Sequence, residues 1–277
     1  LASSPYAMSG VLWDMWRNRR KDREVLVWHA PTALMNPAVP EHFLKAEKRR
    51  DPENYRREYE AEFTEAVSAF LPAAAIEACV VEGRTEVEPE ANWLYRAGID
   101  AAFKGDRFVL AIGHRNGAGV VVVDHLSGWQ GTRQEPVRLG AVIPEIKKQL
   151  ERYRVGSVYA DQYGAEPLRH AFAEAGIGFQ EVTFTSQSKA DLYSTLRARI
   201  LDRRLELLDH KDSLRELRGL EVELLPGGAV RIRHGSSGHD DYADAIALAV
   251  REAGLRGPLD THVYAAGRPS IEEDKWI

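Results

Sequence analysis

Cysteine is almost absent from this chain of 277 residues, in which Cys79 is the single thiol. One thiol cannot form an internal disulfide or build a cysteine-rich zinc site, and it fits a reducing compartment. Long apolar runs are also missing, because no stretch approaches the roughly 18 residues that a membrane span needs. The N-terminus lacks the basic, apolar and small-residue order of a secretory signal. We therefore expect no membrane partner.

Several catalytic motifs are missing as well. The chain has no Gly-x-x-x-x-Gly-Lys-Ser/Thr loop to cradle the phosphates of a nucleotide, and no Gly-x-Ser-x-Gly nucleophile turn. Its nine histidines show no His-Glu-x-x-His zinc spacing. The formal net charge is −5, so a nucleic-acid partner would have to be met by a local basic surface.

The composition is typical of a globular protein, with 44% hydrophobic and 29% charged residues. Residues 1–85 carry helical signals at Ser9–Arg23 and Glu41–Ala69, separated by the short apolar run Val25–Trp28. In the second helical segment, aromatic residues recur every four positions, which is a helical stripe. Glu82–Glu90 is polar, contains glycine and proline, and is predicted to be a linker.

After this linker the pattern becomes regular. Short turns predict three antiparallel strands at Trp93–Ala101, Arg107–Gly113 and Gly119–Asp124. Strands and helices then alternate, which predicts parallel strands with right-handed crossovers: helix Leu139–Tyr153, strand Ser157–Asp161, helix Glu166–Ala175, strand Phe179–Thr185 and helix Asp191–Arg204. A hairpin (Glu221–Leu225 and Ala229–His234) and a helix (Asp240–Ala253) follow. The predicted fold is an α/β mixed sheet with helices on both faces, plus a helical N-terminal segment.

Two aspartates end predicted strands. Asp100 closes the first strand, and Asp161 lies at the carboxyl end of a parallel strand, where ligands of α/β sheets bind. A purely structural role is open at both positions, because Asp100 can form a turn and Asp161 can cap the next helix. Asp106 follows at the start of the second strand, where it either points back toward Asp100 or shapes the turn.

A third acidic group lies in the string His239-Asp240-Asp241-Tyr242-Ala243-Asp244. Acidic residues at a helix N-terminus complement the helix dipole, but three aspartates on an alanine-rich helix exceed that need. Asp240 and Asp244 share one face of the helix, whereas Asp241 is rotated by about 100°. We expect Asp241 to be a metal ligand, Asp240 to support it or hold a second ion, and Asp244 and His239 to support the site.

Short carboxylates that converge from distant segments form a site for Mg²⁺ or Mn²⁺. Two such ions can hold the attacking and leaving oxygens of a phosphodiester displacement. If the strands ending at Asp100 and Asp161 are neighbours, both carboxylates reach one end of the sheet. The sequence therefore predicts a metal-dependent DNA nuclease.

Basic residues could hold DNA beside these acids. Lys189 precedes an arginine-rich helix, and Arg231 and Arg233 alternate with apolar residues in the hairpin, so that both arginines share a face. A hairpin of this kind can follow a phosphate backbone. An ordinary solvated charged face is the alternative.

The order and context of these motifs resemble the large subunit of tailed-phage terminases over nearly the whole chain. Gly98-Ile99-Asp100 with Asp106, Tyr159-Ala160-Asp161-Gln162-Tyr163-Gly164 and Gly238-His239-Asp240-Asp241-Tyr242-Ala243-Asp244-Ala245 look like the three acidic motifs of its nuclease domain. Ala2-Ser3-Ser4-Pro5-Tyr6 is similar to the end of the terminase ATPase domain.

The resemblance implies a ribonuclease-H-like fold and two-metal cleavage of concatemeric viral DNA during packaging. It divides the chain into the end of the ATPase domain and its connector (1–85), the nuclease domain (86–255) and a C-terminal tail (256–277). A start at Leu1 instead of methionine then fits a fragment whose ATPase loop lies upstream. The implied partners are double-stranded DNA and, for the full protein, the portal protein and small terminase subunit, in the host bacterial cytoplasm.

The roles expected from this are that Asp100 bridges two ions, Asp161 holds one and Asp241 the other, while Lys189 and the hairpin position the duplex. Two alternatives stay open. One is a Holliday-junction resolvase or transposase on the same fold. The other is a noncatalytic docking module whose acidic cluster only caps a helix.

Overall fold

The computed structural model describes residues 5, 10–19, 21, 24, 26–63, 67–101, 107–132, 134–162, 165–224, 230–234 and 239–255. The strands are β1 (Val67–Ala69), β2 (Val80–Val81), β3 (Tyr95–Ala101), β4 (Arg107–Arg115), β5 (Val121–Gln130), β6 (Ser157–Asp161), β7 (Gly178–Val182), β8 (Leu205–Leu208), β9 (Leu220–Leu224) and β10 (Val230–His234). The helices are α1 (Gly10–Asn18), α2 (Thr32–Met35), α3 (Glu41–Arg50), α4 (Pro52–Glu58), α5 (Ala73–Glu77), α6 (Leu139–Arg152), α7 (Ala165–Glu174), α8 (Ser186–Leu201), α9 (Lys211–Gly219) and α10 (Asp241–Leu255).

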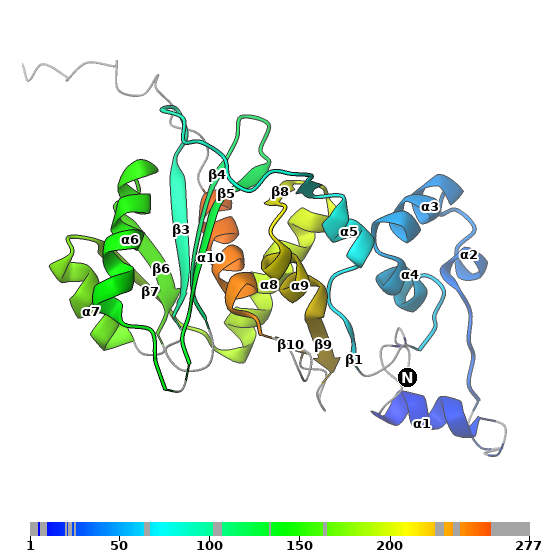
Figure 1. The fold of residues 1–277 in the computed structure, drawn as a ribbon. Coiled ribbons are helices and arrows are strands. Elements are labelled where there is room, and N and C mark those ends of the chain that lie inside the picture. The colour runs from blue at the N-terminus through cyan, green and yellow to red at the C-terminus, as the bar shows by residue number, and fades with distance from the viewer. Residues whose placement is uncertain are drawn as a thin grey trace, which may run out of the picture.

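The centre of the molecule is a seven-stranded sheet in the order β2-β8-β5-β4-β3-β6-β7 (Figure 1). Strands β3, β4 and β5 pair antiparallel, and β6 and β7 continue from β3 in parallel. The sequence predicted this arrangement, three antiparallel strands followed by parallel ones, and the structure confirms it. On the other side of β5 the sheet is extended by the parallel strands β8 and β2, which were not predicted.

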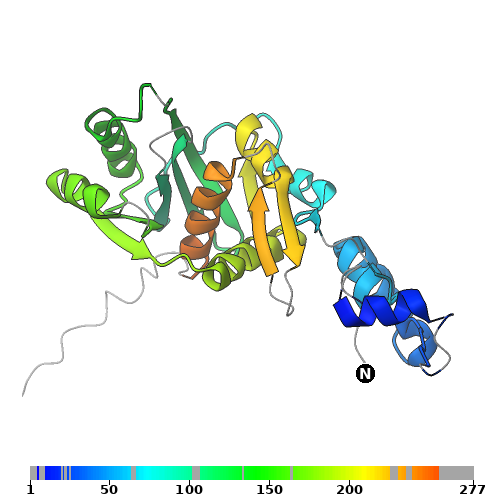
Figure 2. The same cartoon turned by 90° about the horizontal axis from the view of Figure 1, so that it is seen from below.

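Helices cover both faces of this sheet, which is why β4 is apolar along almost its whole length. Helices α6 and α7 lie on one face, and α10 lies on the other (Figures 1 and 2). Helix α6 packs through Val142, Ile143, Ile146 and Leu150, whose spacing puts them on one side of a helix. We call the two surfaces of the sheet the α6 face and the α10 face.

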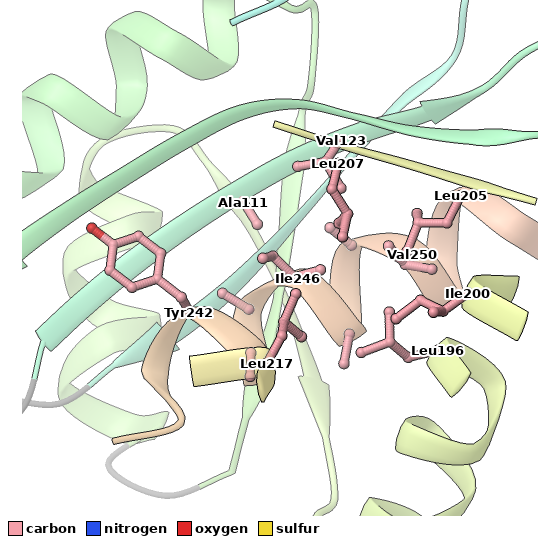
Figure 3. Close-up of a cluster of buried hydrophobic side chains, with 14 of the residues drawn as sticks. Ala111, Val123, Leu196, Ile200, Leu205, Leu207, Leu217, Tyr242, Ile246 and Val250 are labelled. Carbon is pink, nitrogen blue, oxygen red and sulfur yellow. The ribbon is translucent and has the colours of Figure 1, made fainter. Parts of the chain in front are cut away.

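Helix α10 is buried nearly all around, because it lies between the sheet and the helices α8 and α9. Ile246 and Val250 project from it among side chains of the sheet and of α8, including Ala111, Val123 and Leu196 (Figure 3). The many alanines of α10 allow this close approach on several sides. The first turn of α10 is therefore held firmly relative to the sheet. This turn carries Asp241 and Asp244, and Asp240 directly precedes it; we call these three aspartates the acidic cluster. Among the described residues, no helix has the length and apolar character that crossing a bilayer requires.

The predicted hairpin β9–β10 forms a second sheet with β1, antiparallel in the order β1-β9-β10. Helices α1–α4 lie on the same side of the molecule as this small sheet (Figure 1). The junction between α3 and α4 contacts α8 through an ion pair between Asp51 and Arg197. Arg50, the last residue of α3, pairs with Asp202, just after α8, at 2.8 Å. The domain boundary at 85/86 stays a prediction, although residues 67–81 already contribute one strand to each sheet.

The helical prediction for Glu41–Ala69 is only partly right, because the segment holds two helices and ends in a strand. Helix α3 ends before Asp51, whose backbone is not helical (φ −147°, ψ 87°) because it precedes Pro52. The Asp51 side chain then accepts a hydrogen bond from the Asn54 N–H at 3.1 Å and caps α4. Helix α4 ends at Glu58, and Val67–Ala69 is a strand. The apolar run Val25–Trp28 forms no strand over its described residues, and α9 was not predicted.

Cys79 is expected to react slowly with thiol reagents in the folded chain. Its side chain is buried, and burial raises the pKa of the thiol to about 11. The thiolate is the reactive form, so labelling by a disulfide reagent at pH 8 should be about 100-fold or more slower than in urea. Similar rates in the two states, measured by stopped-flow absorbance, would contradict this burial.

Candidate active site

Asp100 and Asp161 end neighbouring strands at the same edge of the sheet. Strands β3 and β6 pair in parallel, with Ile99 opposite Ala160, so Asp100 and Asp161 occupy the next position on each strand. Ile99 and Ala160 are buried on the α6 face. Because side chains alternate along a strand, Asp100 and Asp161 belong to the α10 face. The adjacency on which the nuclease prediction depended is therefore present.

Gly98 allows α10 to lie directly on β3. A Cβ atom at this position would come within 2.4 Å of the Ala245 carbonyl oxygen and 2.7 Å of the Ala249 nitrogen. Both are backbone atoms of α10, so no side-chain rotation could relieve the overlap. This close approach brings the first turn of α10, with Asp241 and Asp244, to the part of the sheet that carries Asp100.

Lys189 of α8 joins two of the three aspartates of the acidic cluster. Its Nζ atom lies 3.0 Å from Oδ2 of Asp240 and 2.7 Å from Oδ2 of Asp244. The hydroxyl of Tyr193, one turn further along α8, donates to Oδ1 of Asp244 at 2.6 Å. Burial alone would lower the pKa of Lys189, but the charges of Asp244 and Asp240 outweigh it and raise that pKa. The ammonium group is therefore a permanent cation in this part of the site.

Asp241 faces the opposite side, toward β4 and α9. Its Oδ2 atom accepts a hydrogen bond from the Arg107 backbone N–H at 2.9 Å. Beside it the buried Glu216 accepts from the N–H groups of Tyr242 (2.6 Å) and Ala243 (3.3 Å). Glu216 thus caps α10 from another helix. Burial, with a contribution from the charge of Asp241, raises the pKa of Glu216 to about 7.

Asp100 experiences the combined charge of this cluster. Burial raises the pKa of Asp100 well above its usual range, and repulsion from Asp244, Asp241 and Asp240 raises it further. Crowded carboxylates of this kind disfavour ionisation until a cation joins them. Their hard oxygen donors match the chemistry of a divalent ion such as Mg²⁺.

The described residues contain no group of three His, Cys, Asp or Glu side chains at the spacing of a metal site. The carboxylates of the acidic cluster are instead held by protein donors, namely Lys189, Tyr193 and the Arg107 N–H. The type of donor therefore fits a divalent ion, whereas the ligand geometry is not assembled. The metal-binding role of Asp100, Asp161, Asp240 and Asp241 stays a prediction.

Four further residues were predicted to belong to the site or to hold DNA: Arg231, Arg233, His239 and Asp106. Arg231 and Arg233 share one face of β10, as predicted, and pair with glutamates of β9, at 3.8 Å to Glu223 and 3.5 Å to Glu221 respectively. His239 is exposed just before α10. Asp106 lies outside the described residues.

Two residues of this site, Glu216 and Arg107, were not predicted from the sequence. Glu216 belongs to α9, where its neighbours Ser213, Leu214 and Leu217 are also buried. A carboxylate on the apolar side of an amphipathic helix was the signal that could have found it. For Arg107 the sequence offered no comparable signal, because its position beside Asp241 depends on the packing of α10 against β4.

A mixed sheet with this strand order, covered by helices on both faces, defines the ribonuclease-H-like class of fold. No protein-family model matches the chain, and no curated protein matches its sequence. Solved structures do match, and they include large terminases of phages. The nuclease of thermophilic phage G20c is 19% identical with a TM-score of 0.56, and the match covers 65% of this chain and 96% of that one.

Two longer structures of the same kind match most of the chain. The large terminase of bacteriophage HK97 is 18% identical over 88% of this chain (TM-score 0.57), and that of a further thermophilic bacteriophage is 14% identical over 90% (TM-score 0.62). In both cases this chain spans 60% of the matched terminase. The resemblance to the terminase nuclease domain is thus confirmed at the level of the fold.

Proposed function

We propose that the chain is a metal-dependent DNA endonuclease that cuts concatemeric viral DNA during genome packaging, as a phage large terminase does. The observation that supports this most is that Asp100 and Asp161 end neighbouring parallel strands, while the charges of Asp240, Asp241 and Asp244 act on Asp100. Three acidic segments far apart in the sequence then face one region. A noncatalytic helix cap would need only the aspartates of α10.

Divalent ions are the proposed cofactors. The G20c nuclease has been solved with bound magnesium, with bound cobalt and with bound zinc, and the acidic residues of this chain are oxygen donors of the kind that Mg²⁺ and Mn²⁺ prefer. We assign Asp100, Asp161 and Asp241 as ligands, with Asp240 in support. Bound ions would lower the pKa of the attacking water and stabilise the leaving 3′ oxygen.

The remaining residues of the site have supporting roles in this proposal. Lys189 and Tyr193 hold Asp244 and thereby orient the first turn of α10 against α8. Lys189 and the hairpin arginines contribute positive charge for double-stranded DNA. Contacts with a portal protein and a small terminase subunit, and residence in the bacterial cytoplasm, belong to the same proposal for the full protein.

Cleavage of plasmid DNA is expected with Mn²⁺ or Mg²⁺ and should disappear when the metal is removed. The reason is that bound divalent ions both activate the attacking water and stabilise the leaving oxygen of a phosphodiester displacement. The measurement is conversion of supercoiled plasmid to nicked and linear forms on a gel, with excess EDTA as the control.

The same assay separates the alternatives. Preference for a four-way junction over linear duplex would favour a resolvase. Failure to nick DNA under several divalent metals would contradict the endonuclease and favour a docking module.

A further inference from the structure

A positively charged side chain, that of Arg107, lies at the same edge of the sheet as the acidic side chains. Strand β4 runs antiparallel to β3, so its first residue, Arg107, lies at the edge where Asp100 and Asp161 end their strands. Phe108 is buried on the α6 face and Val109 on the α10 face, so alternation assigns Arg107 to the α10 face. Asp161, Asp100 and Arg107 thus follow one another across three adjacent strands.

The Arg107 guanidinium is fixed in place and still accessible. It lies 3.4 Å from Glu216 and 3.7 Å from Asp212, and 5.7 Å from the ring of Tyr242. These ion pairs are longer than the roughly 2.7–2.9 Å of a strong charge-assisted bond. The Arg107 side chain keeps 21% of its surface exposed. The group therefore keeps donors for an incoming ligand while its neighbours limit its motion.

A phosphodiester that approaches this edge carries negative charge toward a cluster of carboxylates, so cations on the walls must offset the repulsion. Lys189 provides one on the side of Asp240 and Asp244, and Arg107 provides one on the side of Asp241. A planar guanidinium with several donors suits a phosphate better than any other side chain.

We infer that Arg107 binds a backbone phosphate of the DNA next to the scissile bond, with Glu216 and Asp212 positioning its guanidinium. This inference deepens the proposed function and rests on it for the identity of the ligand. It requires no base specificity, since a phosphate contact is made equally to every sequence.

The experiment measures the affinity of a fluorescein-labelled duplex of about 20 base pairs by anisotropy at several salt concentrations, in Mg²⁺ buffer. The protein is the full chain carrying Asp161→Asn, so that the probe stays intact. Adding Arg107→Gln should weaken binding on the order of tenfold and make the slope of log K against log salt shallower by about 0.9, the value of one phosphate contact. Arg107→Lys should keep most of that slope.

The matched control is Arg169→Gln on α7, whose arginine pairs with Glu181 on a different element and should leave affinity and slope unchanged. Binding by the Arg107→Gln protein with the parent affinity and slope would overturn the inference. Equal losses in the Gln and Lys variants, together with a lower melting temperature, would overturn it too, because they indicate a structural role.

Failure of this inference can be told apart from failure of the proposed function. If the chain cuts plasmid DNA but binds duplex DNA independently of Arg107, the inferred phosphate contact is wrong and the proposed endonuclease still stands. If binding depends on Arg107 but the chain cuts DNA with no divalent metal tested, the phosphate contact is supported and the proposed endonuclease is wrong.

Discussion

Replacement of Asp161 by Asn should reduce metal-dependent DNA cleavage by a factor on the order of 10³. The substitution keeps the size of the side chain and removes the charge at the end of β6 that we propose as a metal ligand. Loss of several kcal/mol of transition-state stabilisation by a bound ion corresponds to a rate loss of this size. Because asparagine has nearly the same shape and volume as aspartate, the metal-free fold should keep its stability.

The measurement is the initial rate of plasmid nicking in Mn²⁺, together with the melting temperature with and without the metal. The parent chain should be stabilised by Mn²⁺, since an ion that binds only the folded state shifts the equilibrium toward it, and Asp161→Asn should lose most of that shift. A suitable control is Asp202→Asn, which removes an exposed carboxylate paired with Arg50 far from the site. Equal nicking by the parent and the Asp161→Asn protein would remove Asp161 from the mechanism.

Gly98→Ala should strongly destabilise the folded chain. The added Cβ would meet backbone atoms of α10 at 2.4 and 2.7 Å, so the helix must move away from β3. Overpacking of a rigid core costs about 1–3 kcal/mol and sometimes more, and we expect about 3 kcal/mol in the free energy of unfolding. In a domain of this size that lowers the melting temperature by roughly 6–12 °C. The displacement of Asp241 from Asp100 should also reduce cleavage.

Urea unfolding followed by circular dichroism measures the loss of stability. Gly140→Ala is the matched control, because nothing lies within 4 Å of its added Cβ and it occupies the first turn of α6, where alanine is a better helix former than glycine. The control should be neutral or slightly stabilising. A Gly98→Ala chain as stable as the Gly140→Ala chain would mean that α10 is not packed against β3 as described.

The central fold followed from local patterns. Short turns predicted the antiparallel strands β3 to β5, and the alternation from α6 to α8 predicted parallel strands and their covering helices. Such signals depend on neighbouring residues, so they survive without tertiary information. The prediction failed at Glu41–Ala69, where helical signals on both sides of Asp51-Pro52 were assigned to one segment although proline restricts the residue before it.

The extension of the sheet by β8 and β2 could not be predicted from the sequence, and the reason is different. These strands have four and two residues, and runs this short are not distinguished from turns by periodicity. Their strand character comes from pairing with partners remote in the chain: β8 lies between β5 and β2, and β2 comes from a segment more than a hundred residues earlier.

The sequence by itself determined where the acidic side chains lie in the secondary structure. Asp100 and Asp161 are at strand ends and Asp241 is at the start of a helix, because nearby residues decide where a strand ends and where a helix begins. Only the tertiary structure decided that β3 and β6 are neighbours, that Lys189 joins Asp240 to Asp244, and that Arg107 and Glu216 stand beside Asp241. The hydrogen bonds from Lys189 to Asp240 and from Arg107 to Asp241 join residues 51 and 134 positions apart. No local pattern encodes such contacts, because they follow from how α10 packs between the sheet and the helices α8 and α9.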